Sequence, residues 1–444
     1  MKKVLILAYD FPPYVSVGGL RPYNWYKYLH EFDLEPIVVT RQWDNKYGNH
    51  LDYIASSKSG QTIVETTEFG TIIRTPYKPN TANRLMLKYG EAKYRFLRKS
   101  ISAYYEFTQW LWNTGPKVQL YFAARAYLKT NKADVIIATG DPFILFKYAS
   151  KLSREFNIPW IADYRDTWVQ DKTGSKNSFA VPFRKILEQK YLKSSACITT
   201  VSSFIVKHLT SNIRNKEFNI ILNGFDEDAL MKNGAVKQES SVFTISFSGT
   251  IYKWHPWKSF LTGLSEFKKL INAEVCMIFW GVNIIGEMEE YINKNCKNIA
   301  ENVLFYPKIE NSKLLAELAK SNLLLLFNDY SILGTKIFDY IAVKRKIIFC
   351  YSNDSNALKL KAEHYCLDEY ETESSLLQEE IILKTDSGVI VNNSTHLMEV
   401  FDGLYKEFRE NGYVACNSCD IRTYSRKEQT AKLASLIRGL TDKT

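Results

Sequence analysis

The sequence predicts an α/β protein of two doubly wound domains that face each other across a cleft, and three observations lead to this prediction. Solidly apolar runs of strand length alternate with segments of helix length along the whole chain, as in βαβ units whose parallel sheet is buried on both faces. A chain of 444 residues is too long for a single hydrophobic core. The composition turns polar at residues 237–241, between the two sets of apolar runs.

The apolar runs define the expected strands in order. In the first half of the chain they are residues 4–9, 36–40, 72–75, 135–139, 160–164, 197–201 and 219–223. In the second half they are residues 243–249, 275–281, 303–306, 323–327, 346–351 and 388–391.

These runs predict one domain at residues 1–225, a linker at 226–241 and a second domain at 242–420. The remaining segment, 421–444, begins with a capping box, Ser425-Arg-Lys-Glu428. It continues with one apolar helical face made by Leu433, Leu436, Ile437 and Leu440. We expect this terminal helix to cross back and pack on the first domain, because an apolar face needs a partner.

Composition limits the classes of partner. The apolar and charged shares, 45% and 24%, are those of a soluble globular protein. The net charge of +10 favours phosphates, nucleic acid or an acidic membrane surface. No apolar run approaches the roughly 18 residues of a membrane span. The amino-terminal run 4–8 is followed at once by Asp10, which indicates a first strand rather than a signal peptide.

The cysteines indicate a reducing compartment. Cys197, Cys276 and Cys350 lie inside apolar runs, as reduced, buried thiols of cytosolic proteins do. Cys416 and Cys419 form a lone CxxC, which is a weak zinc signal without a second pair or a nearby histidine. We therefore expect a cytoplasmic protein with no metal and no cofactor.

Residues 84–132 form a basic, aromatic segment between two expected strands. Ten Lys and Arg against two Glu give it a charge of +8, and it holds eleven aromatic residues. Such a segment favours an anionic membrane surface or a lipid-linked substrate, which would place the protein on the inner face of the cell membrane. The alternative is that the aromatics are core and the cations a solvated face. Nucleic acid is a weaker alternative, because no recognition motif accompanies the charge.

The run Gly334–Ala342 lies between two expected strands of the second domain. Gly334 can bring the backbone close to a ligand, because it has no Cβ. Lys336 supplies a point charge suited to a phosphate, and Asp339 shares its face on a helix. A cation and a carboxylate at the carboxyl end of a strand suit a nucleotide-sugar, which carries both phosphates and hydroxyls. The alternative is an ordinary i,i+3 ion pair on the surface.

Two motifs of the first domain also follow expected strands. Gly18 and Gly19 come just before a helix, where free backbone N–H groups can bind an anion. Arg21 could add charge there, and the alternative is a plain turn. The run Asp163–Asp166 holds two carboxylates and an arginine, which are costly to bury unpaired. They either pair with each other or line the cleft, and we favour the cleft.

The first strand of the second domain repeats this layout of strand, glycine and polar loop. Gly249 and Thr250 follow the strand, and Lys253, His255 and Lys258 are the nearby cations that could neutralise a diphosphate. His255 is expected to be a solvent-exposed loop residue.

Together, these motifs resemble glycosyltransferase family 4, with its two-domain GT-B fold. Each motif is degenerate alone, but their order and spacing from end to end are specific. They are Phe11-Pro-Pro, Gly18-Gly19, Ala138-Thr-Gly-Asp-Pro142, Asp163-Tyr-Arg-Asp-Thr-Trp168, Thr200-Val-Ser-Ser203, Asn223-Gly-Phe-Asp226, Gly249-Thr-Ile-Tyr252, Gly334–Ala342 and Tyr424-Ser-Arg426.

The resemblance implies transfer of a sugar from a nucleotide-sugar, with retention of the anomeric configuration and without a metal. It implies that the Gly19 backbone meets the donor phosphate, that Lys336 and Lys253 hold the diphosphate, and that Asp339 binds the ribose hydroxyls. The other donor-binding positions that it implies are Gly18, Gly249, Thr250, Gly334 and Thr335.

The sequence departs from the family at three points. Ser331 stands where the family often has a second glutamate, eight residues before Asp339. Thr250 follows Gly249, so the usual Arg…Lys pair is not intact. Asp141 stands where many members carry a histidine. The candidate catalytic residues are then Asp141, Arg165 and Asp166.

We therefore predict a metal-independent, hexosyltransferase-type bacterial glycosyltransferase. Its acceptor would be a saccharide or a polyprenyl-linked saccharide, in the synthesis of a polysaccharide such as lipopolysaccharide or capsule. Two alternatives stay open: a nucleotide-sugar epimerase on the same fold, and a non-catalytic subunit that has lost the donor site. Nucleic acid is not expected as a partner.

Overall fold

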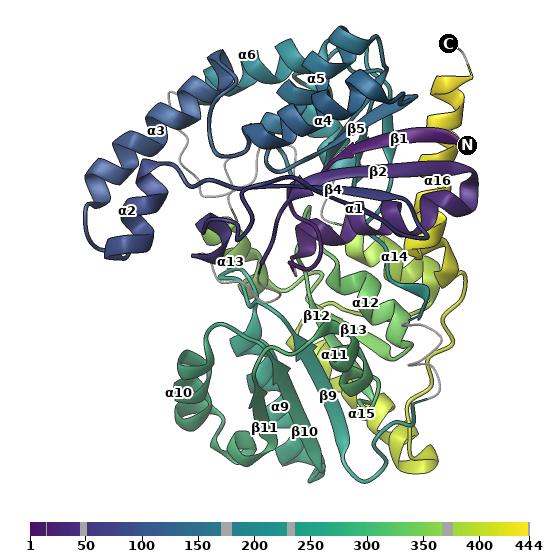
Figure 1. Cartoon of the computed structure of the whole chain (residues 1–444). Coiled ribbons are helices and arrows are strands. Elements are labelled where there is room, and N and C mark those ends of the chain that lie inside the picture. Colours follow the sequence, from purple (N-terminus) through teal and green to yellow (C-terminus); the bar gives the residue numbers. More distant parts are fainter. Residues whose placement is uncertain (15, 45–50, 170–179, 229–235, 366–375, 443–444) are drawn as a thin grey trace. The chain divides into compact units, whose positions relative to one another are not determined.

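The computed structural model describes residues 1–14, 16–44, 51–169, 180–228, 236–365 and 376–442. The chain divides into two compact units, each built on its own sheet. The first unit comprises the described residues of Met1–Gln170, Asn177–Leu222 and Lys427–Thr444, and the second comprises those of Asn223–Arg426. The predicted α/β class is confirmed, because both units alternate strands with helices (Figure 1).

The first unit holds an eight-stranded sheet in the order β3-β4-β2-β1-β5-β6-β7-β8. Its strands are β1 Lys2–Leu7, β2 Leu34–Arg41, β3 Ile63–Thr66, β4 Thr71–Thr75, β5 Val135–Gly140, β6 Trp160–Tyr164, β7 Cys197–Thr200 and β8 Phe218–Ile220. All neighbours pair in parallel except β3, which is an antiparallel edge strand. The strand order reverses between β1 and β5, which makes this the topological switch point of the sheet.

The helices of the first unit cover this sheet, and two of them reach away from it. They are α1 Val17–Tyr28, α2 Thr81–Tyr89, α3 Arg95–Leu111, α4 Val118–Thr130, α5 Ile144–Phe156, α6 Ala180–Leu192, α7 Ser203–Thr210 and α16 Arg426–Thr441. The predicted insertion, residues 84–132, therefore folds as three helices. Figure 1 shows α2 and α3 projecting from the sheet, whereas α4 packs on it.

The terminal helix α16 contributes to the core of the first unit. Leu433, Ala434 and Ile437 are buried there against strand residues such as Val4 and Ile6. Val4 and Leu433, which are 429 positions apart in the sequence (433 − 4), therefore belong to one core.

The second unit holds a six-stranded parallel sheet in the order β11-β10-β9-β12-β13-β14. Its strands are β9 Phe243–Ser248, β10 Val275–Trp280, β11 Val303–Tyr306, β12 Leu323–Phe327, β13 Lys346–Cys350 and β14 Gly388–Val391. Its helices are α9 Trp257–Ile271, α10 Ile285–Asn295, α11 Asn311–Leu318, α12 Lys336–Val343, α13 Ser355–His364, α14 Leu377–Thr385 and α15 Ser394–Asn411.

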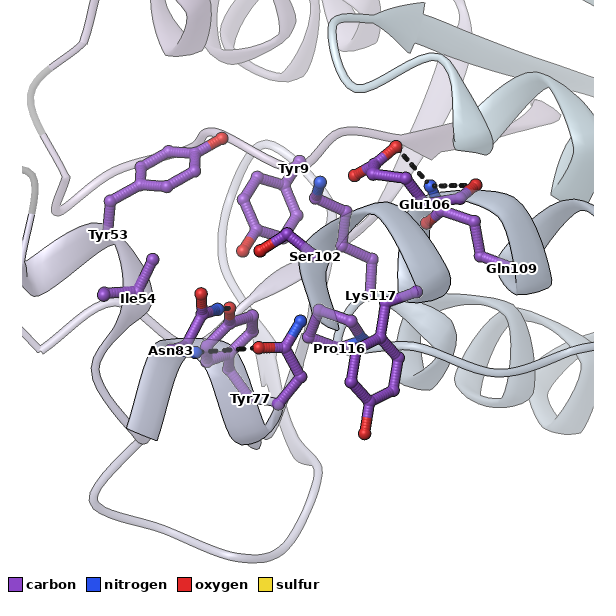
Figure 2. A pocket seen from close by; sticks show the side chains of 12 residues that line it. Tyr9, Tyr53, Ile54, Tyr77, Asn83, Ser102, Glu106, Gln109, Pro116 and Lys117 are labelled. Carbon is purple, nitrogen blue, oxygen red and sulfur yellow. Dashed lines mark hydrogen bonds between the residues drawn. The ribbon is translucent and has the colours of Figure 1, made fainter. Parts of the chain in front are cut away.

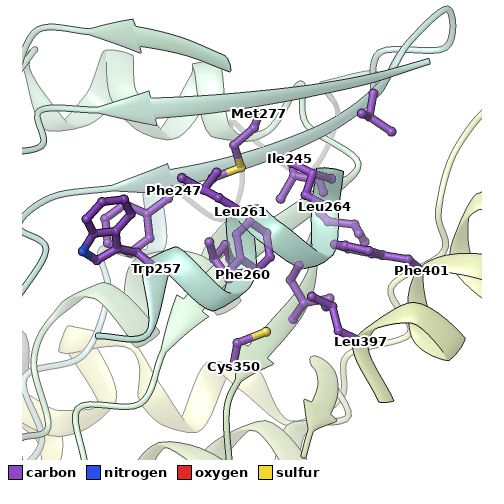
Figure 3. Packing of buried hydrophobic residues seen from close by; sticks show 14 of the residues in the cluster. Ile245, Phe247, Trp257, Phe260, Leu261, Leu264, Met277, Cys350, Leu397 and Phe401 are labelled. Carbon is purple, nitrogen blue, oxygen red and sulfur yellow. The ribbon is translucent and has the colours of Figure 1, made fainter. Parts of the chain in front are cut away.

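The core of the second unit lies between its sheet and two long helices. Phe260 and Leu264 of α9 meet Leu397 and Phe401 of α15, and Ile245 of β9 lies beside them (Figure 3). The strand order of this sheet reverses between β9 and β12, which makes that place the switch point of the second unit.

The predicted strands match the observed ones to within three residues at each end, because continuous apolar runs mark buried strands well. The edge strand β3 was not predicted, since its side chains are exposed and its residues form no apolar run. The predicted linker, 226–241, contains residues outside the described part, and its last residues contact the second unit through Gln238, whose Nε2 donates to the Val414 carbonyl at 2.7 Å. No helix in the described part of the chain is long and apolar enough to cross a membrane.

Candidate active site

The first candidate site lies at the switch point of the second unit. β9 ends at Ser248 and is followed by Gly249, whose φ of +90° is a backbone conformation that favours glycine. α12 begins with Lys336, and the space beside Gly249 is occupied by its side chain, since a Cβ on Gly249 would lie 3.6 Å from Lys336 Cε. The Lys336 amine lies 4.0 Å from the centroid of the Phe247 ring. The predicted lysine therefore reaches the end of the central strand.

The charge on Lys336 is poorly compensated. Burial lowers the pKa of its amine to about 8, although Asp329 acts in the opposite direction. Among the described residues no hydrogen-bond acceptor lies within range of this nitrogen. Thr335, the N-cap of α12, makes no side-chain hydrogen bond to the first turn. An amine beside the amino-terminal end of a helix, at the carboxyl edge of a sheet, forms a site that favours an anion.

A buried histidine and aspartate lie next to this lysine. His255 Nε2 donates to Asp329 Oδ1 at 2.7 Å, and His255 Nδ1 accepts the backbone N–H of Tyr252 at 3.2 Å. Because Nδ1 accepts a hydrogen bond and therefore carries no proton, the imidazole is neutral, and burial lowers the pKa of His255 despite the neighbouring carboxylate. Burial opposes ionisation of Asp329, but its interactions with His255 and Lys336 outweigh this and lower its pKa.

The expectation that His255 is solvent-exposed is therefore wrong. Its side chain is buried and ties the loop after Gly249 to the loop after β12. Thr250 and Lys253, in the same loop, are exposed. Asp329 was missed by the sequence analysis, although it follows a fully apolar strand almost directly. Its position just after a buried strand, rather than any motif, could have identified it as a candidate site residue.

Asp339 does not pair with Lys336. Burial raises the pKa of the Asp339 carboxyl to about 6; Arg426 opposes this and Asp226 adds to it. The lysine side chain instead extends toward Gly249. The surface ion pair considered from the sequence is thus absent among the described residues. Lys336 lies next to Gly249, whereas Asp339 interacts with Arg426 and Asp226. Gly334 has open space around it.

The second candidate site lies at the switch point of the first unit, where the loops after β1, β5 and β6 meet. Arg165 Nε donates to the Gly140 carbonyl at 2.7 Å, and Nη2 donates to the Asp141 carbonyl at 2.8 Å. A Cβ on Gly18 would lie 2.2 Å from Arg165 Nη1 and 2.9 Å from Asp10 Oδ2. Glycine at position 18 therefore allows the arginine and the aspartate to approach the start of α1.

Ser16 connects this cluster to α1. Its hydroxyl donates to Asp10 Oδ2 at 2.9 Å and accepts the N–H of Gly19 at 3.0 Å as the helix cap. The Gly19 N–H is therefore occupied, and the expectation of a free amide for a phosphate is not met in this conformation.

Asp10 is the residue of this cluster that the sequence analysis missed. Its Oδ1 atom is buried and has no hydrogen-bond partner among the described residues. Burial raises the pKa of this carboxyl, an effect that Ser16 and Arg165 partly offset. An unsatisfied buried carboxylate oxygen is costly, so it marks a place where a ligand hydroxyl would be favourable. The predicted residues Asp141 and Asp166 are exposed.

Asp163 and Arg21 have a structural role instead. Arg21 Nη2 donates to Asp163 Oδ1 at 2.7 Å, both side chains are buried, and Thr199 Oγ1 donates to the same carboxylate at 2.7 Å. Placing Asp163 at the cleft was therefore wrong, as was adding Arg21 to the glycine turn. The two residues were predicted separately because 142 positions separate them.

A cavity of about 180 Å³ lies in the first unit beside the loops after β1 and β4. Tyr9 and Tyr77 belong to these loops, and Lys117 Nζ lies 5.4 Å from the centroid of the Tyr9 ring (Figure 2). The helix α3 contributes the side chains of Ser102, Tyr105, Glu106 and Gln109. Aromatic faces with a few amides, a cation and a carboxylate are typical of small-molecule sites.

The amino-terminal half of the chain matches a known family. Residues 22–229 fit the model of Glycosyltransferase Family 4. Through this match, the amino-terminal part of the chain is similar to glycosyltransferase family 4. No curated protein sequence matches it.

Solved structures of other proteins share the fold of this chain. A sucrose-phosphate synthase from Thermosynechococcus elongatus has a TM-score of 0.59 at 13% identity, with 100% of both chains covered. A structure from E. coli, described as trehalose-6-phosphate bound with UDP-2-fluoro glucose, has a TM-score of 0.53 at 9% identity, covering 98% of this chain and 99% of that one. Anabaena Alr3699/HepE in complex with UDP has a TM-score of 0.52 at 11% identity, covering 99% and 100%. The predicted GT-B fold is confirmed.

Proposed function

We propose that this chain transfers a sugar, with retention, from a nucleotide-sugar to a saccharide or polyprenyl-linked saccharide. The observation that carries the proposal is the Lys336 amine, which makes no hydrogen bond among the described residues and lies beside Gly249 at the switch point of the second unit, in a chain whose amino-terminal part matches family 4. Two of the structures that share the fold contain UDP or a UDP-sugar, which supports a nucleotide-sugar donor. The product would be a bacterial surface polysaccharide, such as lipopolysaccharide or capsule.

In this proposal the second unit binds the donor. Lys336 and the amino-terminal end of α12 would hold the diphosphate beside Gly249, and Lys253 would add charge from the exposed loop. The charge that develops on the departing diphosphate would be stabilised by these fixed groups, without a metal. Asp339 would accept hydrogen bonds from the ribose, and its raised pKa means that such bonds would strengthen as the carboxyl ionises.

The first unit would bind the acceptor. Asp10 offers an unsatisfied carboxylate oxygen, and Arg165 lies beside it at the carboxyl edge of the sheet. We propose that these two residues position the reacting hydroxyl, while Asp141 and Asp166 are exposed candidates nearby. The site would work in the cytoplasm, where the free thiols of Cys197 and Cys350 stay reduced.

The test is a transfer assay on the purified protein. Each of the UDP-, GDP-, ADP-, TDP- and CMP-sugars is supplied with saccharide and lipid-linked acceptors, and the product is followed by mass spectrometry and by NMR of its anomeric proton. The proposal predicts a glycosylated acceptor with the donor's anomeric configuration. Conversion of a donor without acceptor would instead support an epimerase, and binding without turnover would support a non-catalytic subunit.

A further inference from the structure

The helix α3 of the first unit has two faces of different character. One face lines the cavity, beginning at Ser102 and ending at Gln109. The opposite side carries what we call the outer face of α3, which consists of Phe96, Leu97, Tyr104, Phe107 and Leu111. Spacings of three, four and seven or eight residues place these side chains on one side of the helix.

The outer face of α3 is strongly exposed. Phe96 is 85% exposed, Tyr104 is 64% exposed and Phe107 is 50% exposed. Other aromatic residues of the same insertion do enter the core; the ring of Trp110, for example, stacks on Trp168 with centroids 5.0 Å apart. Phe107 also contacts the Phe183 ring of α6, with centroids 5.5 Å apart. Phe96 and Tyr104 stay exposed although the first unit offers partners for aromatic residues. A contiguous exposed apolar surface of this kind marks an interaction site.

Exposed cations lie at the edges of this surface. They are Arg84 and Lys88 on α2, Lys93 between the helices, and Arg95 and Lys99 in the first turns of α3. The two on α3 lie seven residues before Ser102 and Glu106, so they are on the cavity side of the helix rather than on its outer face. Aromatic side chains with flanking Lys and Arg match the apolar interior and the anionic headgroups of a lipid surface. A second copy of the chain would instead bring the same cations face to face, which is unfavourable. Charge complementarity therefore favours lipid over self-association.

We propose that α2 and the outer face of α3 dock on an anionic lipid bilayer. The aromatic side chains of α3 insert among the headgroups while the cations contact the phosphates. The helix lies in the interface rather than across it, in keeping with its 17 residues and its polar inner face.

This docking also selects between the two acceptors of the proposed function, and in that respect it rests on that proposal. The inner face of the same helix lines the cavity, so a glycan entering the cavity would be attached to a lipid held in the adjoining surface. The acceptor class is then a lipid-linked saccharide rather than a free one.

The experiment is co-sedimentation of the full chain with vesicles. One set is phosphatidylcholine alone and the other contains one third phosphatidylglycerol. The wild type is expected to bind the anionic vesicles and to be released by high salt. Replacing Arg95→Gln and Lys99→Gln together should weaken binding by roughly 30-fold, at about 1 kcal/mol per cation near the surface. Phe96→Gln with Tyr104→Gln should weaken it by about tenfold or more.

The matched control is Lys269→Gln with Leu270→Gln, which removes one exposed cation and one exposed apolar side chain at the end of α9. This variant should bind vesicles like the wild type. Absence of binding to anionic vesicles, or binding that the α3 variants leave unchanged, would overturn the inference. So would a wild-type dimer, seen by light scattering, that the Phe96→Gln, Tyr104→Gln variant dissociates without any vesicle binding.

The nucleotide-induced thermal shift of the same α3 variants separates this inference from the proposed function. A retained shift with lost vesicle binding supports both. Vesicle binding that depends on α3, without any nucleotide shift in the wild type, supports the docking surface and counts against the donor site.

Discussion

Replacing Lys336 with methionine should remove most of the affinity for the nucleotide while leaving the fold intact. The amine is partly buried and has no hydrogen-bond acceptor among the described residues, so its loss leaves no buried partner unpaired. A charge-assisted hydrogen bond to a diphosphate contributes roughly 1.5–3 kcal/mol, which corresponds to about tenfold to about 150-fold in Kd. Methionine loses the cation–π contact of the amine, which lies 4.0 Å from the centroid of the Phe247 ring, but its thioether can fill the same space against the ring.

Isothermal titration calorimetry across pH measures this contribution directly. Because burial holds the pKa of Lys336 at about 8 in the free protein, binding of a diphosphate requires the amine to take up a proton above that pH. The wild-type affinity should therefore be constant below pH 7.5 and fall about tenfold per pH unit above 8. The Lys336→Met variant should bind weakly at every pH.

The control for this experiment is Lys294→Met, at an exposed position in the last turn of α10. Its nucleotide affinity and pH profile should match the wild type. Thermal unfolding gives a second readout. At a nucleotide concentration of 100 times Kd, binding should stabilise the folded protein by about 2.7 kcal/mol, which for a unit of about 200 residues is a shift of roughly 5–11 °C in Tm. If Lys336→Met shows an unchanged Kd and pH profile, the assignment of this lysine to the diphosphate is refuted.

Three further predictions concern stability and the first unit. Asp163→Ala should lower the free energy of unfolding by about 3–5 kcal/mol in urea titrations, because it leaves the buried Arg21 unpaired; a change below 1 kcal/mol would contradict the structural role. In the wild type, the folded Asp339 carboxyl has a raised pKa and holds a proton that the unfolded chain has released, so the free energy of unfolding should fall by at most about 3 kcal/mol as the pH rises from about 4 to about 6. Asp339→Asn should abolish this fall. Parallel pH–stability curves for the wild type and the variant would argue against it. Gly18→Ala should displace Arg165 and reduce kcat of transfer by more than tenfold with little change in donor affinity, whereas Gly286→Ala, which meets no atom within 4 Å, should leave kcat unchanged.

Much of the fold could be predicted from the sequence, since its strands are buried on both faces and read as unbroken apolar runs. The edge strand β3, Ile63–Thr66, escaped prediction because it is exposed and its side chains carry no apolar pattern. Parallel topology and the switch points follow from βαβ winding, so the sequence alone places Gly249 and Lys336 at strand ends.

The parts of the sites that escaped prediction depend on contacts between distant positions. The burial of His255 results from Asp329, 74 residues away, and the pairing of Arg21 with Asp163 spans 142 residues. Asp10 was passed over because nothing local distinguishes an unsatisfied carboxylate from a solvated one. The direction in which the aromatics of α3 point was left open, because spacing alone cannot say whether a helical face finds a partner.

The most direct test of the central claim is the release of nucleoside diphosphate from a nucleotide-sugar, measured with and without acceptor in the presence of anionic vesicles. A transferase predicts release that requires the acceptor, matches the amount of glycosylated product and is lost in Lys336→Met. Release that is equal without acceptor, or no release from any donor when lipid-linked saccharides are supplied, would contradict the account.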